Sequence, residues 1–259
     1  MKSEHTFVVC AYKESRYLEE CVLSLLGQKF PSEVVVYTST PNETIQSVVD
    51  KYNLKLFTAE GSGIGIDWNR SLSVAQTKYV TIAHQDDIYD KNYSEKILKA
   101  FKNDSHTLIA FSNYQELRNG TVIRRGLNLK VKDMLLRPIQ WFPKSKKARN
   151  FALSFGNGIC CPAVSYNKEL LKDFKFDETM RTSLDWEGWY RIAQMKGSFA
   201  YLPESLMYHR IHEESETTHT IADNSRMKED REMFEKYWPK WFVNILMHLY
   251  VKSQDSNTL

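Results

Sequence analysis

The sequence predicts an α/β fold in which helices flank a mostly parallel central sheet. Short runs rich in β-branched residues alternate with segments of helical periodicity over the first hundred residues, as expected for βαβ units. The chain has 259 residues, 42% of them hydrophobic, which is enough for one large domain with its own core. No linker-like stretch or internal repeat divides it, so we expect one compact domain whose second half is built onto the sheet of the first.

Four strands, each followed by a helix, are expected in the first hundred residues. The strands cover residues 6–12, 33–39, 54–59 and 78–84. Apolar residues at helical spacing mark the helices at Leu18–Leu26, Ile45–Tyr52, Trp68–Ala75 and Tyr93–Phe101. Ligands bind at the carboxyl ends of strands in such sheets, so chemistry is expected after strands one, two and four.

The pattern changes from about residue 108. Two strand-like runs flank Asn119-Gly120, a hairpin signal. Pro138 and Pro143 argue for irregular structure further on. A helix over 184–196, a short strand over 198–202 and two closing helices over 223–236 and 238–252 are expected. The last helix has an apolar face, for which packing or dimerisation is favoured over membrane contact: Trp238, Trp241, Phe242, Ile245, Leu246, Leu249 and Tyr250.

Charge is unevenly distributed along the chain. The net charge is +3, but the segment from Arg118 to Arg149 holds ten Lys or Arg against Asp133 alone, giving 10 − 1 = +9 and leaving 3 − 9 = −6 for the rest. Such a segment indicates an anionic partner or a solvated loop. No apolar run approaches the ~18 residues of a membrane span, and the N-terminus does not resemble a signal peptide. Four cysteines without a disulfide or metal pattern indicate reduced thiols and a cytoplasmic location.

Three groups of residues could carry chemistry. Asp86 and Asp87 follow the fourth strand, where paired carboxylates suit Mg²⁺ or Mn²⁺, although a solvated turn would look the same. Asp185 and Glu187 begin a helix, where a carboxylate could be a general base or simply be stabilised by the helix dipole. Asp185 lies on the stripe of Trp189, Ile192 and Ala193 that we expect to be buried, whereas Glu187 is expected to face solvent. The third group, His209, Arg210 and His212, could contact a metal or phosphate.

Several enzyme classes lack their signatures. The glycines at 61–65 do not fit the dinucleotide-binding pattern, and the chain has no P-loop, no nucleophile-elbow motif and no zinc-protease spacing. Dinucleotide oxidoreductases, P-loop enzymes and zinc hydrolases therefore lose their main sequence support.

Taken in order, these segments resemble the GT-A glycosyltransferases of the large inverting family two, common in bacterial polysaccharide and glycan assembly. TFVVCAYKESRYLEECVLSLLGQ resembles the family's first strand and helix, AHQDD its DXD region, LDWEGWYRIA its acceptor-side helix and YHRIHEES a late segment. The resemblance covers roughly residues 5–218. It implies a Rossmann-like GT-A domain over 1–225, with a nucleotide-sugar-binding half to about 115, an acceptor-side half from about 116, and a helical extension over 226–259.

The resemblance also implies roles for individual residues. Asp185 would be the catalytic base, and Asp86, Asp87 and His212 would bind a divalent cation, Mn²⁺ or Mg²⁺. The implied contacts to the nucleotide sugar are Ala11, Tyr12, Glu14, Thr38, Ser39, Asp67, Asn69, Gln85, Asp86 and Arg210.

Two positions depart from the family pattern. The second strand ends Tyr37-Thr38-Ser39-Thr40 where the family has DDGS, so hydroxyls or backbone must replace a carboxylate, and Asp67 could supply part of the missing charge. His84 stands where the family has the first DXD carboxylate.

The implied reaction is transfer of a sugar, with inversion, from a nucleotide-diphosphate sugar to a hydroxyl of a glycan or lipid-linked acceptor. A UDP-sugar is the expected donor. A homodimer, or peripheral contact with the inner face of the membrane, is compatible with this reaction. One alternative is a sugar nucleotidyltransferase, although AYKES stands where that class carries a Gly-rich basic loop. Another is a catalytically impaired nucleotide-sugar-binding or membrane-docking module, suggested by His84 and TSTP. No nucleic-acid partner is expected, because the basic segment lacks regularly spaced aromatics.

Overall fold

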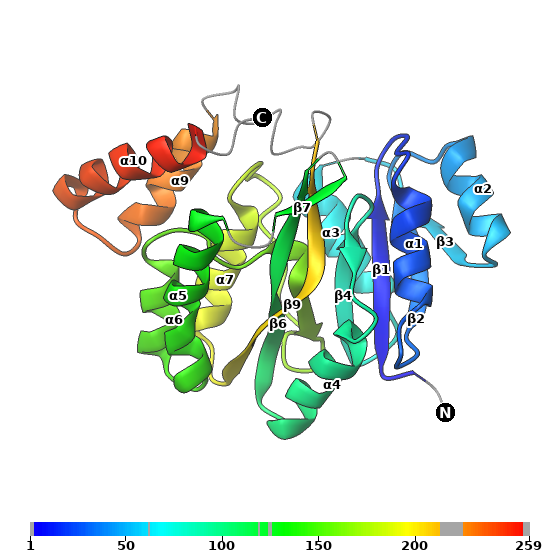
Figure 1. Ribbon diagram of the computed structural model, residues 1–259, viewed down its shortest axis with the longest axis horizontal. Coiled ribbons are helices and arrows are strands. Elements are labelled where there is room, and N and C mark those ends of the chain that lie inside the picture. The colour runs from blue at the N-terminus through cyan, green and yellow to red at the C-terminus, as the bar shows by residue number, and fades with distance from the viewer. Residues whose placement is uncertain (1–2, 62, 119, 124–125, 213–224, 256–259) are drawn as a thin grey trace.

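A nine-stranded sheet forms the centre of the molecule (Figure 1). The computed structural model describes residues 3–61, 63–118, 120–123, 126–212 and 225–255. The strands lie in the order β3-β2-β1-β4-β8-β6-β9-β5, and β7 pairs with β6. Helices α1 and α2 lie at one end of the sheet, and α9 and α10 at the other.

The first half follows the predicted alternation. The strands are β1 (His5–Ala11), β2 (Glu33–Thr38), β3 (Lys55–Thr58) and β4 (Tyr79–His84), all paired in parallel. The helices are α1 (Leu18–Leu26), α2 (Glu43–Lys51), α3 (Ile64–Val74) and α4 (Tyr93–Asn103). Because successive side chains of a strand point to opposite faces, Phe7 and Val9 pack in the core with α1 and α4, while Val8 packs with Trp68 of α3. The parallel sheet therefore brings the ends of β1, β2 and β4 to one edge.

The second half makes the sheet mixed rather than parallel throughout. Its strands are β5 (Ile88–Tyr89), β6 (Thr107–Arg118), β7 (Thr121–Ile123), β8 (Val164–Asn167) and β9 (Ser198–Ile211). Strand β8 runs antiparallel between β4 and β6, and β6 pairs in parallel with β9. The predicted hairpin is confirmed as β6–β7, although Asn119 of its turn lies outside the described residues.

The prediction of irregular structure was wrong at Pro138, whereas Pro143 does lie in a turn between two helices. The segment forms α5 (Leu127–Trp141) and α6 (Lys146–Leu153), with Pro138 inside the last turn of α5. Burial of Leu136 and Ile139 on the sheet outweighs the loss of one helical hydrogen bond at the proline. The solvated-loop interpretation also fails for Arg149, which is fully buried with its guanidinium 4.9 Å above the ring of Phe199.

The short strand predicted over 198–202 is also wrong in extent, since β9 continues for 14 residues to Ile211. The proline at 203 cannot donate to the ladder, and the pairing with β6 shifts register there, from Leu202 to Ser205. As a result His209 and Arg210 lie within a strand instead of after one.

The remaining elements are one 3₁₀ turn and three helices. A 3₁₀ turn, η1 (Cys161–Ala163), precedes β8, and the helices are α7 (Leu184–Gln194), α9 (Ser225–Glu235) and α10 (Lys240–Asp255). Among the described side chains of α10, Val243 and Met247 are buried, and the predicted apolar face did not include them. Of that face, Trp238 and Leu246 are only partly buried against the core, and Trp241 and Ile245 are 68% and 50% exposed. Leu249 and Tyr250 lie outside the side chains that are described. All four cysteines are free. None of the described helices is long and apolar enough to cross a membrane.

Candidate active site

Asp86 lies in the turn between β4 and β5, at the carboxyl edge of the sheet. Its Oδ1 accepts a hydrogen bond of 3.0 Å from Ser15 Oγ, and its Oδ2 lies 3.2 Å from His212 Nε2. A carboxylate oxygen and an imidazole nitrogen this close can bind the same divalent cation. Within the described ranges no group of three or more His, Cys, Asp or Glu side chains could hold a metal. A cation here would therefore take its other ligands from substrate phosphates and water, as Mg²⁺ sites commonly do.

Asp87 points away from that pair and into the protein. It is 1% exposed, and its Oδ1 accepts from the backbone N–H of Arg210 at 2.9 Å and lies 3.0 Å from His209 Nδ1. Burial lowers the pKa of His209, but the charge and hydrogen bond of Asp87 outweigh it and raise that pKa above its usual value. Asp87 thus joins the turn after β4 to β9.

Arg210 stabilises the turn between β4 and β5. Its Nε donates to the backbone oxygen of Asp86 at 2.8 Å, its Nη2 donates to Glu20 Oε2 at 2.5 Å, and its guanidinium lies 4.1 Å from the ring centre of Tyr17. The side chain is almost fully buried. It provides a fixed positive charge next to the backbone of Asp86.

Gln85 ties together the ends of β1 and β4. Its Oε1 accepts from the backbone N–H of Tyr12 at 3.1 Å, and its Nε2 donates to the Tyr12 carbonyl at 2.9 Å. Ala11 is buried at the end of β1, while the side chains of Tyr12 and Glu14 are exposed. The chain after β1 turns at Lys13, whose φ of 54° is left-handed and whose N–H donates to Thr40 Oγ1 at 2.6 Å.

Asp67 places a carboxylate at the end of β2, where the sequence has none. It is 5% exposed and accepts from Ser39 Oγ at 2.8 Å and from the Tyr37 hydroxyl at 3.2 Å. Burial raises its pKa above the usual value despite these bonds. Arg70, which the sequence reasoning missed, donates to the same Tyr37 hydroxyl at 3.2 Å. Thr38 is fully buried and accepts from the N–H of Thr40.

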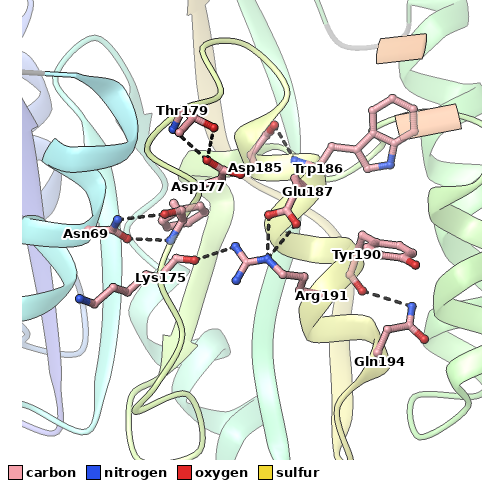
Figure 2. Close-up of polar contacts among 11 residues, drawn as sticks. Asn69, Lys175, Asp177, Thr179, Asp185, Trp186, Glu187, Tyr190, Arg191 and Gln194 are labelled. Carbon is pink, nitrogen blue, oxygen red and sulfur yellow. Dashed lines mark hydrogen bonds and ion pairs between the residues drawn. The ribbon is translucent and has the colours of Figure 1, made fainter. Parts of the chain in front are cut away.

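Asn69, two residues after Asp67 on α3, bonds to a different part of the chain. Its Oδ1 accepts from the N–H of Phe176 at 2.7 Å, and its Nδ2 donates to the Phe176 carbonyl at 3.0 Å (Figure 2). The same Nδ2 donates to Glu178 Oε1 at 2.9 Å. The structure uses this side chain to anchor the loop before α7 to α3.

Asp185 occupies the first turn of α7. Its Oδ1 accepts from the N–H of Trp186 at 2.7 Å and its Oδ2 from Asn157 Nδ2 at 2.6 Å. Burial raises the pKa of Asp185 to about 6, against these two bonds, which lower it. Burial raises the pKa of the Cys160 thiol, and the negative charges of Asp87 and Asp185 raise it further. Sequence reasoning missed Asn157, because a lone Asn carries no pattern.

The expectation that Glu187 faces solvent was wrong. Glu187 is 7% exposed, and both its oxygens accept from Arg191 Nε at 2.8 Å. Arg191 in turn donates from Nη2 to the carbonyl of Lys175 at 2.6 Å, which ties the pair to the loop before α7 (Figure 2). The buried stripe predicted from Trp189, Ile192 and Ala193 is confirmed.

Comparison with known proteins shows the family of the chain. The model of the family Glycosyl transferase family 2 matches residues 6–174, well over half of the chain. The chain belongs to this family. It is a glycosyltransferase, and it is 23% identical over 214 residues to an uncharacterized glycosyltransferase of Methanocaldococcus jannaschii, covering 79% of this chain and 69% of that protein.

Solved glycosyltransferases share the fold of this family 2 member. S. aureus TarS 1–349 in complex with UDP-GlcNAc superposes with a TM-score of 0.67 at 17% identity, over 95% of this chain and 70% of that one. The mannosyltransferase PcManGT from Pyrobaculum calidifontis, in complex with GDP-Man and Mn²⁺, gives 0.63 at 18% identity, over 97% and 70%. The predicted GT-A fold is thereby confirmed.

Proposed function

We propose that this glycosyltransferase moves a sugar from a nucleotide-diphosphate sugar to a hydroxyl of a glycan or lipid-linked acceptor, with inversion at the anomeric carbon. The observation that carries the proposal is the contrast between two carboxylates. Asp86 stands beside His212 at the edge of the sheet, and Asp185 is half-buried with its pKa raised to about 6. Two acids with different environments are suited to two different roles in one reaction. The UDP-GlcNAc and GDP-Man bound by the structural neighbours support the donor class, and a UDP-sugar is the expected donor.

At the donor end, Asp86 and His212 would hold a divalent cation, Mn²⁺ or Mg²⁺. A cation there supplies charge that stabilises the leaving diphosphate. Ser15 and Arg210 keep the turn in place by bonding to the carboxylate and to the backbone of Asp86. Asp87 is better placed to hold β9 than to bind the cation itself, because its carboxylate is buried against His209 and the Arg210 backbone.

At the acceptor end, Asp185 would act as the general base. It accepts the proton of the acceptor hydroxyl as that oxygen attacks the anomeric carbon, and the carbon–diphosphate bond breaks in the same displacement. The N–H of Trp186 and the amide of Asn157 fix the orientation of the carboxylate. A single displacement of this kind inverts the anomeric centre.

Asp67 is the proposed substitute for the carboxylate missing from the end of β2. Its contacts with Ser39 and Tyr37 bring it to that strand end, beside the ends of β1 and β4, where the nucleotide would bind. A carboxylate there can accept a hydrogen bond from a base or ribose donor of the nucleotide.

A donor screen tests the function. Purified protein is incubated with UDP-, dTDP- and GDP-sugars and Mn²⁺, and release of nucleoside diphosphate is measured for wild type and Asp185→Asn. The proposal expects release from at least one donor and loss of it in the variant. A binding module would retain the nucleotide without turnover, and a nucleotidyltransferase would instead form a nucleotide sugar from a nucleoside triphosphate and a sugar phosphate.

An aromatic surface supports action at an anionic membrane face. Neighbouring rings lie 4.9–5.5 Å apart along the chain of contacts Phe151, Phe155, Trp238, Phe242 and Trp241, running from α6 to α10. Its two ends, Phe151 and Trp241, are 49% and 68% exposed. The exposed Lys147 and Lys240 belong to the same two helices. Exposed aromatics with lysines suit the interface of an anionic bilayer.

Vesicle flotation tests this surface. Recovery should be higher with vesicles containing anionic lipid than with neutral ones, should fall in high salt, and should fall again in Trp241→Ala. Equal recovery from both vesicle types would exclude the membrane. A wild-type dimer in light scattering that Trp241→Ala converts to monomer would assign the surface to a second copy of the chain instead.

A further inference from the structure

Helix α9, distant in sequence from the first turn of α7, binds the segment that leads into it. The carboxylate of Glu229 accepts four hydrogen bonds of 2.7–2.9 Å: from the backbone N–H groups of Arg181, Thr182 and Ser183, and from the Thr182 hydroxyl. The next residue, Asp230, is 3% exposed and accepts from the Ser183 hydroxyl at 2.7 Å.

These contacts fix the chain immediately before α7 and do not cap the helix itself. Ser183 is the residue before the first turn of α7, yet its side chain makes no capping bond to its own helix. Its hydroxyl bonds to Asp230 instead, and Glu229 binds the three N–H groups that precede the helix. Two carboxylates at this end also suit the positive end of the helix dipole. Burial raises the pKa of Glu229, but the bonds from Arg181, Thr182 and Ser183 outweigh it and hold that pKa below its usual value.

Packing holds the two helices in one position. Trp186, directly after Asp185, packs its ring edge-on against Phe234 of α9, with ring centres 5.0 Å apart, and both side chains are buried. Trp186 Nε1 also donates to the Leu153 carbonyl at 3.0 Å. The first turn of α7 is therefore held by a hydrogen bond to α6 and by ring packing against α9.

We propose that Glu229 and Asp230 are positioning residues for Asp185, so that α9 is part of the catalytic apparatus and not an accessory extension. This inference rests on the proposed role of Asp185 as base. Glu229 fixes residues 181–183 immediately before Asp185, and Asp230 fixes Ser183 two residues away. A base must meet the acceptor hydroxyl at hydrogen-bond distance, so a displaced first turn would reduce turnover while the donor site at β1, β2 and β4 stays intact.

The charges around Asp185 provide a second readout. On α9, Arg226 lowers the pKa of Asp185 and Asp230 raises it. Burial raises the pKa values of Cys160, Cys161 and Tyr166, and the negative charge of Asp185 raises them further. Asn157 donates to the Asp185 carboxylate. Because Asp230 is the negative member of this group on α9, Asp230→Asn should lower the pKa of Asp185, whereas a purely structural contact at that position would leave it unchanged.

The experiment compares Glu229→Gln, Asp230→Asn and the control Glu232→Gln, an exposed residue of the same helix. For each, kcat, the donor Kd and the ¹³C titration of the Asp185 carboxyl are measured in aspartate-labelled protein. The Asp185 signal is assigned by its loss in Asp185→Asn. Glu229→Gln should lower kcat tenfold or more with the donor Kd within twofold of wild type, Asp230→Asn should move the Asp185 titration to lower pH, and Glu232→Gln should change neither.

Two results would overturn the inference. One is a Glu229→Gln protein that melts earlier but keeps the wild-type kcat, which would make the contact structural only. The other is an Asp185 titration unchanged in Asp230→Asn, which would show that α9 does not act on Asp185. The titration requires no turnover, so it remains decisive even if Asp185→Asn proves fully active and the proposed base role fails.

Discussion

Replacing Asp185 with asparagine should make the enzyme nearly inactive and at the same time more stable. The introduced amide keeps the size of the side chain and the hydrogen bond from Trp186, but it cannot accept a proton. Turnover should fall by about 10²–10⁴, with nucleotide binding near wild type. The side-chain amide of Asn157 can flip end for end, so that its Oδ1 accepts a hydrogen bond from the introduced amide. This flip breaks no other bond of Oδ1, which is buried without a hydrogen-bond partner among the described residues.

The stability gain follows from the raised pKa. The folded-state pKa of about 6 lies above the usual 3.8, so the folded protein binds the proton more tightly than the unfolded chain. Ionisation of Asp185 therefore destabilises the fold as pH rises from about 4 to 6, and the cost is complete above that range. The difference between the two pKa values corresponds to a free energy of unfolding lower by about 3 kcal/mol at most. For a side chain that retains some contact with water, we expect about 1–3 kcal/mol.

Urea denaturation at pH 8 and pH 4.5 measures this effect. Asp185→Asn should raise the free energy of unfolding at pH 8 and much less at pH 4.5, while the turnover of wild type should fall as pH drops below about 6. Glu187→Gln is the control, because Glu187 is paired with Arg191 and should contribute far less to turnover. Wild-type turnover in Asp185→Asn, an inactive Glu187→Gln, or no stability gain at pH 8 would refute the reasoning.

Three further substitutions test other parts of the site and fold. Asp86→Ala should weaken Mn²⁺-dependent nucleotide binding tenfold or more, about 1.4 kcal/mol, and equal calorimetric affinity with and without Mn²⁺ would contradict it. Asp87→Ala removes the acceptor for His209 and the Arg210 N–H, so the free energy of unfolding should drop by about 2–4 kcal/mol in urea titrations. Gly65→Ala would place a Cβ 2.6 Å from the carbonyl oxygen of Asp177, and should cost about 1–3 kcal/mol; unchanged stability would show that the loop yields freely.

The parallel half of the fold could be predicted because its signals are local. The β-rich run of β1, which is buried on both faces, and the i, i+3, i+4 spacing in α1 both depend on residues close in sequence. The error at α5 arose because a local signal was outweighed by tertiary packing. Pro138 argued against a helix, but in the last turn a proline loses only one bond, and burial of Ile139 decides the outcome.

The site was predictable only where residue type and position in the chain suffice. Asp86 stands out as a carboxylate after an apolar strand, and Asp185 as one in a first helical turn. Asn157 and Glu229 could not be found this way, because they reach their partners across 28 residues and across 46 to 48 residues. Their residue types are common on any surface, and only the tertiary structure gives them a role.

The configuration of the released sugar tests the central claim most directly. An α-linked nucleotide sugar accepted in the donor screen is incubated with Mn²⁺ and the enzyme, with water as acceptor if no other is known, and the anomeric proton of the first product is followed by NMR. A single displacement with Asp185 as base predicts that the β-anomer forms first and that Asp185→Asn forms almost none. An α-anomer as first product, or undiminished release by Asp185→Asn, would contradict the account.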